Sequence, residues 1–120
     1  MPKRARGGES GQESAEDRLI ARHFKPIARH PGALGLADDA AVLTPPEGHA
    51  LVVTADAVVG GVHFFPDDPP DAIASKALRV NLSDLAGKGA IPVAYLLTIA
   101  FRADWTEAWV AGFASGLAAD

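Results

Sequence analysis

The sequence predicts an α/β domain of the two-layer α+β kind, in which a small, mainly antiparallel sheet is covered by helices on one face. The chain has 120 residues, the usual size of one domain, and 48% of them are apolar, enough for one core. Stretches with helical spacing of apolar residues alternate with short runs that are apolar almost throughout. Their order is helix, two strands, helix, strand and helix, which suits a two-layer arrangement.

The first element is a helix that follows a disordered leader. Residues 1–15 are rich in Gly, Ser, Glu and Arg and lack apolar periodicity, which is typical of disorder. Ser14 with Asp17 three residues later resembles a capping box and predicts a helix start. Pro26 is expected to kink or end this helix. The predicted domain therefore covers residues 16–120.

Three runs predict strands. A short apolar run at 40–43 is closed by a turn at 44–48 that holds two prolines and a glycine. The run at 50–59 is the strongest strand in the chain, and we expect it to pair with 40–43 as a hairpin. A third strand is expected at 92–101. Strands that are apolar on both faces need cover on both, which predicts a homodimer.

Two further helices alternate with these strands. One is expected over 70–86, because Pro70 suits a first turn and Gly87 or Gly89 can end the helix. The other is expected to be capped by Asp104. Its predicted buried face consists of Trp105, Trp109, Val110, Phe113 and Leu117.

Charge and cysteine content exclude several classes of function. Residues 1–30 hold seven Lys/Arg against four Asp/Glu, whereas residues 31–120 hold four against eleven. An acidic body argues against a nucleic-acid surface, which needs clustered Lys/Arg. The chain has no cysteine, which excludes disulfides, thiolate zinc sites and a cysteine nucleophile and fits a cytoplasmic protein. No apolar run is long enough for a transmembrane helix, and no apolar signal-peptide core follows the basic start.

Three acidic positions stand out by their context. Asp39 lies in a turn before a strand, Asp56 lies in the most apolar strand, and Asp84 shares a helical stripe with apolar residues. A carboxylate in such surroundings must be paired, protonated or bound to a cation. Only three basic residues lie between positions 30 and 101, so hard divalent cations are credible partners. The other interpretation stays open, because Asp56 could face water and Asp84 could cap a backbone group.

Other signatures are absent or weak. His63 follows a Gly-Gly turn, and a lone loop histidine is more often exposed or locally hydrogen-bonded than functional. The sequence contains no P-loop, no dinucleotide-binding glycine fingerprint, no nucleophile elbow and no protein-kinase signature. Composition and spacing alone therefore predict no more than an α/β domain with carboxylates that could bind Mg²⁺.

Four segments resemble the thiamine-monophosphate kinase family. Residues 80–92, VNLSDLAGKGAIP, resemble its VNLSDLAAMGA-P signature, and residues 35–43, GLADDAAVL, resemble its GIGDDAAVL turn. Residues 54–64 resemble its [ST]TD-x-x-V-x-x-x-HF segment, and residues 19–24 match its opening helix. The segments lie in order at family-like spacing and together cover about residues 16–118.

The resemblance implies a fold and an activity. The fold is that of the N-terminal domain of aminoimidazole ribonucleotide synthetase. The family transfers the γ-phosphoryl group of ATP to thiamine monophosphate, giving thiamine diphosphate and ADP, and it uses several Mg²⁺ ions. This domain supplies metal ligands and builds the homodimer, in which strands form a barrel shared with the partner. A second, C-terminal domain that closes over the nucleotide is expected to be absent from this chain.

The resemblance also implies roles for individual residues. Asp39, Asp56 and Asp84 would be Mg²⁺ ligands and act in catalysis through the metal. Thr54 and the main chain of Ala55 would add oxygen ligands. Asp39, Thr54 and Ala55 would together hold the Mg·ATP.

The resemblance also implies that His63 would touch the thiamine phosphate.

The sequence departs from the family pattern at two positions. Ala37 replaces the second glycine of the family's GIGDD turn, so that backbone must manage without positive φ or adjust. Ala55 replaces a threonine, so any ligation there must use its carbonyl oxygen. Neither change removes a carboxylate.

Family members are much longer than this chain, so the isolated chain is expected to be inactive by itself. Two alternatives remain. The parent could be another ATP-dependent enzyme of the same fold, of the aminoimidazole ribonucleotide synthetase, selenophosphate synthetase or hydrogenase-maturation type. The chain could also be a non-catalytic dimerisation module that kept the fold.

Overall fold

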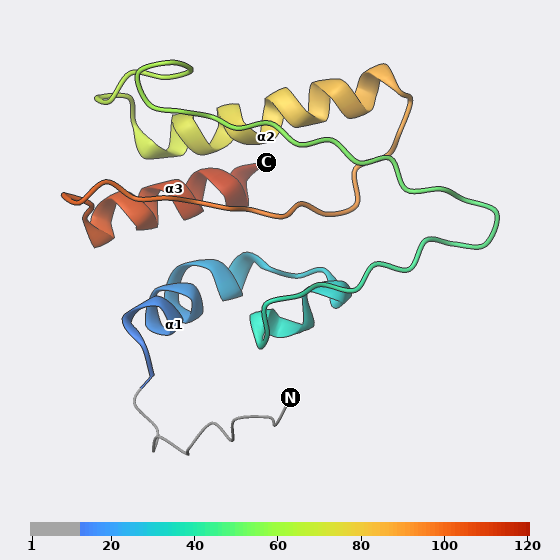
Figure 1. Cartoon of the computed structure of the whole chain (residues 1–120), viewed down its shortest axis with the longest axis horizontal. Helices are drawn as coiled ribbons and strands as arrows, with labels where there is room; N and C mark the ends of the chain where they lie inside the picture. Colours follow the sequence, from blue (N-terminus) through green and yellow to red (C-terminus); the bar gives the residue numbers. More distant parts are fainter. Residues whose placement is uncertain (1–12) are drawn as a thin grey trace, which may run out of the picture.

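The computed structural model describes residues 13–120, and its regular elements are helices (Figure 1). Except for its last three residues, the predicted leader 1–15 lies outside this described part. The elements in chain order are α1 (Ala15–Leu19), a π-helical turn (Ile20–Phe24), two 3₁₀ segments (Lys25–Ile27 and Pro31–Leu36), α2 (Pro70–Gly87) and α3 (Glu107–Ala119). No helix among these residues is long and apolar enough to cross a membrane.

The capping box at the start of α1 is confirmed. The Ser14 hydroxyl accepts a hydrogen bond from the Asp17 amide at 3.0 Å, and the Asp17 carboxylate accepts one from the Ser14 amide at 3.1 Å. The helix then continues as a π-helical turn and ends in a 3₁₀ turn that contains Pro26. This agrees with the predicted end of the helix at that proline.

The core lies between α2 and α3, which pack side by side (Figure 1). The helix predicted over 70–86 is confirmed as α2, with Pro70 in its first turn. The helices approach closely at Gly116, where an added Cβ would lie 2.7 Å from the Cα of Asp71. The core cluster consists of Ile73, Ala74, Phe113 and Leu117.

The start of α3 differs from the prediction. Thr106, not Asp104, caps the helix, because the Thr106 hydroxyl accepts a hydrogen bond from the Trp109 amide at 3.1 Å. Asp104 instead pairs with Arg102 at 3.1 Å. Trp105 precedes the helix and is 46% exposed, so it is not part of the buried face. The remaining four predicted positions are buried or half-buried.

The predicted fold class is wrong, because no β-strand occurs within residues 13–120. The predicted strands at 40–43, 50–59 and 92–101 are extended but carry no ladder of hydrogen bonds. An isolated bridge joins Gly60 to Phe64 within one turn. There is therefore no hairpin and no antiparallel sheet for the helices to cover.

The physical reason is the lack of a partner for each extended segment. Figure 1 shows the segment around residues 50–59 following α2 and the segment around 92–101 following α3. Sheet hydrogen bonds need a second strand about 4.8 Å away, and local β-propensity cannot supply one. The Cα radius of gyration is 17.0 Å, whereas a compact domain of this length has about 13–14 Å.

Candidate functional site

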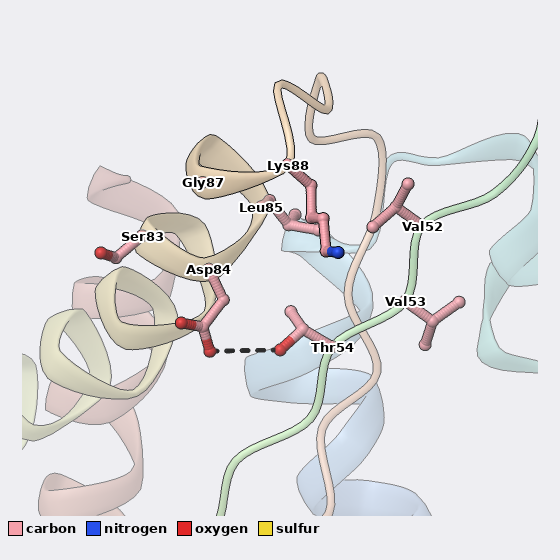
Figure 2. Close-up of a pocket in the computed structure, with 8 residues that line it drawn as sticks. All are labelled: Val52, Val53, Thr54, Ser83, Asp84, Leu85, Gly87 and Lys88. Carbon is pink, nitrogen blue, oxygen red and sulfur yellow. Dashed lines mark hydrogen bonds between the residues drawn. The ribbon is translucent and has the colours of Figure 1, made fainter.

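An open hollow lies between the last turns of α2 and the extended segment that runs beside it (Figure 2). Its volume is ≈ 450 Å³. Thr54 and Asp84 meet inside it, where the Thr54 hydroxyl donates to the Asp84 carboxylate at 3.4 Å. These are two of the predicted ligands, and they are 30 residues apart in the chain. The hollow is lined by Val52, Val53, Thr54, Ser83, Asp84, Leu85, Gly87 and Lys88.

A smaller hollow of ≈ 180 Å³ lies beside the same helix, nearer to its N-terminal end. Asp56 and His63 line it together with Lys76, whose ammonium group donates to the His63 carbonyl oxygen. The His63 ring is fixed at Nδ1, which accepts a hydrogen bond from the Val59 amide at 2.9 Å. In the neutral ring, Nε2 is then the protonated nitrogen and can donate to a ligand.

The remaining predicted ligands lie outside these contacts. Asp39 is exposed in the bend after the 3₁₀ segment and lines neither hollow. Ala55 is exposed between the two hollows. Ala37 has φ −78°, so the turn does not need positive φ there. Positive φ occurs instead at Leu34 and Leu36, with values of 52° and 53°.

The burial argument for the aspartates does not hold, because Asp56 and Asp84 are both exposed. Their carboxylates need no compensating partner and are open to a ligand. Sequence reasoning also missed two lining residues, Lys76 and Lys88, which it counted only among scarce cations. Their spacing of eight and four residues from Asp84 was readable as one ridge of a helix.

The donor set suits Mg²⁺ in one particular way. Among residues 13–120, no three His, Cys, Asp or Glu side chains form a preformed metal cage. Mg²⁺ is commonly held by one or two carboxylates together with substrate phosphates and waters. The Asp84 carboxylate and the Thr54 hydroxyl are oxygen donors of this kind. The residues therefore fit a Mg²⁺ that arrives with a phosphate better than an ion held by the protein alone.

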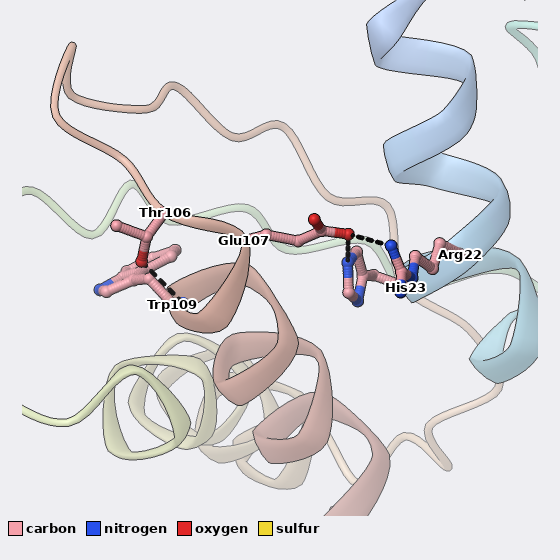
Figure 3. A network of polar contacts seen from close by, with 5 residues as sticks. All are labelled: Arg22, His23, Thr106, Glu107 and Trp109. Atoms are coloured by element: carbon pink, nitrogen blue, oxygen red, sulfur yellow. Dashed lines mark hydrogen bonds and ion pairs between the residues drawn. The ribbon is translucent and has the colours of Figure 1, made fainter.

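A second polar network joins the N-terminal helices to α3 (Figure 3). The Glu107 carboxylate accepts a hydrogen bond from Arg22 at 2.8 Å and lies 3.1 Å from Nε2 of His23. The His23 hydrogen bond and the positive charge of Arg22 lower the pKa of Glu107. Phe24 and Ile27 from the same N-terminal stretch pack against the core. The network thus fastens this stretch beside α3, and none of its three residues lines either hollow.

Comparison with known proteins identifies the family. A family model described as "AIR synthase related protein, N-terminal domain" matches residues 37–120, which include both hollows. The chain therefore belongs to the AIR synthase related protein family and carries its N-terminal domain. No solved structure is a significant match to the chain.

Several curated proteins that are similar to the chain are named thiamine-monophosphate kinase. A thiamine-monophosphate kinase from Caulobacter vibrioides is 48% identical over 102 residues, covering 84% of this chain and 29% of that protein. One from Escherichia coli K12 is 45% identical over 101 residues, covering 82% and 31%. One from Bacillus subtilis is 39% identical over 85 residues, covering 70% and 26%. The resemblance found in the motifs is thus confirmed, and the chain spans less than a third of each of these relatives.

Proposed function

We propose that the chain is the N-terminal part of a kinase that transfers the γ-phosphoryl group of ATP to thiamine monophosphate. The observation that carries this proposal is the 48% identity to a relative of that name across 84% of the chain. The juxtaposition of Thr54 and Asp84 supports it, because phosphoryl transfer needs oxygen ligands for a phosphate-bound cation.

The chemistry asks little covalent work of the protein. An oxygen of the acceptor phosphate attacks the γ-phosphorus of ATP, the bond to the bridging oxygen breaks, and ADP leaves with that electron pair. Mg²⁺ supplies charge neutralisation on the phosphoryl oxygens. Asp84 and Thr54 would hold it, with Asp56, Asp39 and the carbonyl of Ala55 as further ligands that the family resemblance implies. The part played by this chain is to place charged side chains next to the phosphates and to hold the reacting groups in a fixed geometry.

The test is ADP release by the full-length protein from ATP, Mg²⁺ and thiamine monophosphate. Asp84→Asn keeps the shape of the side chain but removes its charge, so we expect kcat/KM to fall by about 100-fold or more. Asp67→Asn is the matched control, since Asp67 is an exposed carboxylate in the loop before α2. We expect the control to retain full activity and the isolated 120-residue chain to have none.

Other results would select another family function. Turnover of ATP with a different phosphorylated or carboxylated acceptor, but not with thiamine monophosphate, would make the parent a sibling enzyme of the family. The broad description of the family model favours this as the second candidate. No turnover with any acceptor would leave a dimerisation module.

We also propose that a second copy of the chain covers the extended segments. Val53, Ile91 and Leu96 are 84%, 85% and 85% exposed, which is costly for residues this apolar. Light scattering should give a dimer mass for the wild-type protein. The double variant Val53→Glu/Leu96→Glu should be a monomer with its helices intact, and an unchanged dimer in that variant would contradict the proposal.

A further inference from the structure

Both hollows belong to one line of contact, which we call the α2 seam. On the helix it is formed by Lys76, Val80, Asp84 and Lys88, each four residues after the last. On the other side it is formed by residues 52–58, which run in the opposite direction. Twelve helical residues rise about 18 Å, and six intervals of extended chain span about 20 Å, so the two sides match in length.

The charges along the α2 seam follow a symmetric order. Asp56 and Asp84 lie in its middle part, and Lys76 and Lys88 lie at its two ends. All four side chains are exposed. Within residues 13–120, neither lysine forms an ion pair, although each lines a hollow that an aspartate also lines. Two carboxylates flanked by two lysines that lack an ion pair suit a ligand with the opposite order of charge, in which a divalent cation lies between two phosphates.

The two ends differ in size and in the donors they offer. At the larger end, Figure 2 shows the Lys88 side chain extending into the hollow toward Thr54, while Asp84 enters from the helix. At the smaller end, Lys76 is held beside His63, whose Nε2 is available as a second donor. A hollow of ≈ 450 Å³ suits a polyphosphate chain, and one of ≈ 180 Å³ with Lys76 and His63 in its lining suits a single terminal phosphate.

We propose that Lys88 binds the polyphosphate of the nucleotide and that Lys76 binds the phosphate of the acceptor, at opposite ends of the α2 seam. This inference rests on the proposed function for the identity of the acceptor, but not for the two-ended arrangement. It assigns the approach direction of the substrates, because the reacting phosphates then meet between the lysines, next to Asp56 and Asp84.

The experiment measures two dissociation constants of the full-length protein by calorimetry, one for Mg·ADP and one for thiamine monophosphate. A hydrogen bond to a charged group accounts for about a 10-fold to 100-fold change in affinity. Lys88→Gln should therefore weaken Mg·ADP by about that factor and leave thiamine monophosphate within about twofold. Lys76→Gln should do the reverse, and Lys76→Arg should restore most of the affinity. Lys25→Gln, which removes an exposed lysine outside the α2 seam, should change neither constant.

The outcomes separate this inference from the proposed function. If the wild-type protein does not bind thiamine monophosphate, inorganic phosphate in the presence of Mg·ADP is the probe for the Lys76 end. Loss of phosphate binding in Lys76→Gln would then support the α2 seam while the acceptor assignment fails. Equal effects of both lysine variants on both constants, or no effect of either, would overturn the inference. So would a wild-type protein that binds neither Mg·ADP nor phosphate.

Discussion

The helical part and the extended part of this molecule use their apolar side chains in opposite ways. In the helical part, Phe113 and Leu117 of α3 are 4% and 5% exposed, and they pack on Ile73 of α2. In the extended part, Val53 and Leu96 are 84% and 85% exposed, although both lie in the most apolar runs of the chain. Apolar residues therefore stabilise the helical part by burial, whereas in the extended part they are exposed and can contact another surface.

The difference shows how the candidate site is built. Helix α2 belongs to both parts, because Ile73 and Ala74 face the core while Lys76, Asp84 and Lys88 face the extended segment. Packing in the core holds α2 in place, and α2 in turn sets the positions of its charged side chains. The extended segment brings Thr54 and Asp56 to those charges without the support of a sheet. The hydrogen bond between Thr54 and Asp84 joins this segment to α2.

The largest expected effect comes from deleting the same side chain in each part. Leu117→Ala should lower the free energy of unfolding by about 2–5 kcal/mol, because it leaves a cavity between α2 and α3. Leu96→Ala should change it by less than about 0.5 kcal/mol at protein concentrations low enough for a monomer. Urea unfolding followed by the helical circular dichroism signal measures both. Similar losses in the two variants would mean that the extended part is as well packed as the core.

The next effect concerns the closest approach of the two long helices. Gly116→Ala should destabilise the chain by about 1–3 kcal/mol, because the new Cβ would meet the backbone of Asp71 and the side chain of Ala74. Gly87→Ala is the control, since nothing lies within 4 Å of its added Cβ at the end of α2. That change should be neutral or slightly stabilising by helix propensity. Destabilisation by both would indicate a backbone effect instead of a steric one.

Helix α2 could be predicted from the sequence because its signals are local. The proline at its start and the periodicity along it act within a few residues. The strands could not be predicted, because the run at 50–59 specifies an extended backbone but not a neighbour to pair with. An extended conformation is a local property of the backbone. Sheet formation also needs a second strand, which comes from a distant segment of the same chain or from another chain. This is why the predicted sheet is absent although its segments are extended.

The site divides in a similar way. The motifs placed Thr54 and Asp84 in one ligand set, and the structure brings them within 3.4 Å across 30 residues. Asp39, from the same predicted set, lies in neither hollow. Asp56 and Asp84 stood out in the sequence because burial was expected, but both side chains are exposed, so their role as ligands stays a prediction. The sequence did not single out Lys76 and Lys88. Their place in the hollows depends on the extended segment that lies opposite α2, and the sequence does not show which segment that is.

A smaller effect tests where the extended part ends and α3 begins. Thr106→Ala should cost about 1 kcal/mol, because it removes the hydroxyl that accepts from the Trp109 amide. Asp104→Ala should have little effect, since that carboxylate pairs with the exposed Arg102. The urea midpoints of the two variants give the comparison. A larger loss in Asp104→Ala would restore the cap predicted from the sequence.

The smallest effect is a pH dependence that only the helical part should show. The pKa of Glu107 is lowered from its ordinary value of 4.5 by the hydrogen bond with His23 and the charge of Arg22. A lowered pKa in the folded state contributes stability that is fully present above that ordinary value and is lost as the pH falls through the lowered one. Glu107→Gln should therefore flatten the fall of the urea midpoint below about pH 4.5. Asp17 and Asp120 also have lowered pKa values, but they contribute equally in the variant and the wild type.

Glu47→Gln provides the matched control, because Glu47 is an exposed carboxylate in the turn of the extended part. Its removal should leave the pH profile of the wild type unchanged, since no cation pairs with its side chain among the described residues. If the two variants flatten the profile equally, the carboxylates act through net charge alone. The contact of Glu107 with Arg22 and His23 would then add nothing to the docking of the N-terminal helices on α3. A difference between the variants would instead assign the acid sensitivity to that contact, and it would confine it to the helical part of the molecule.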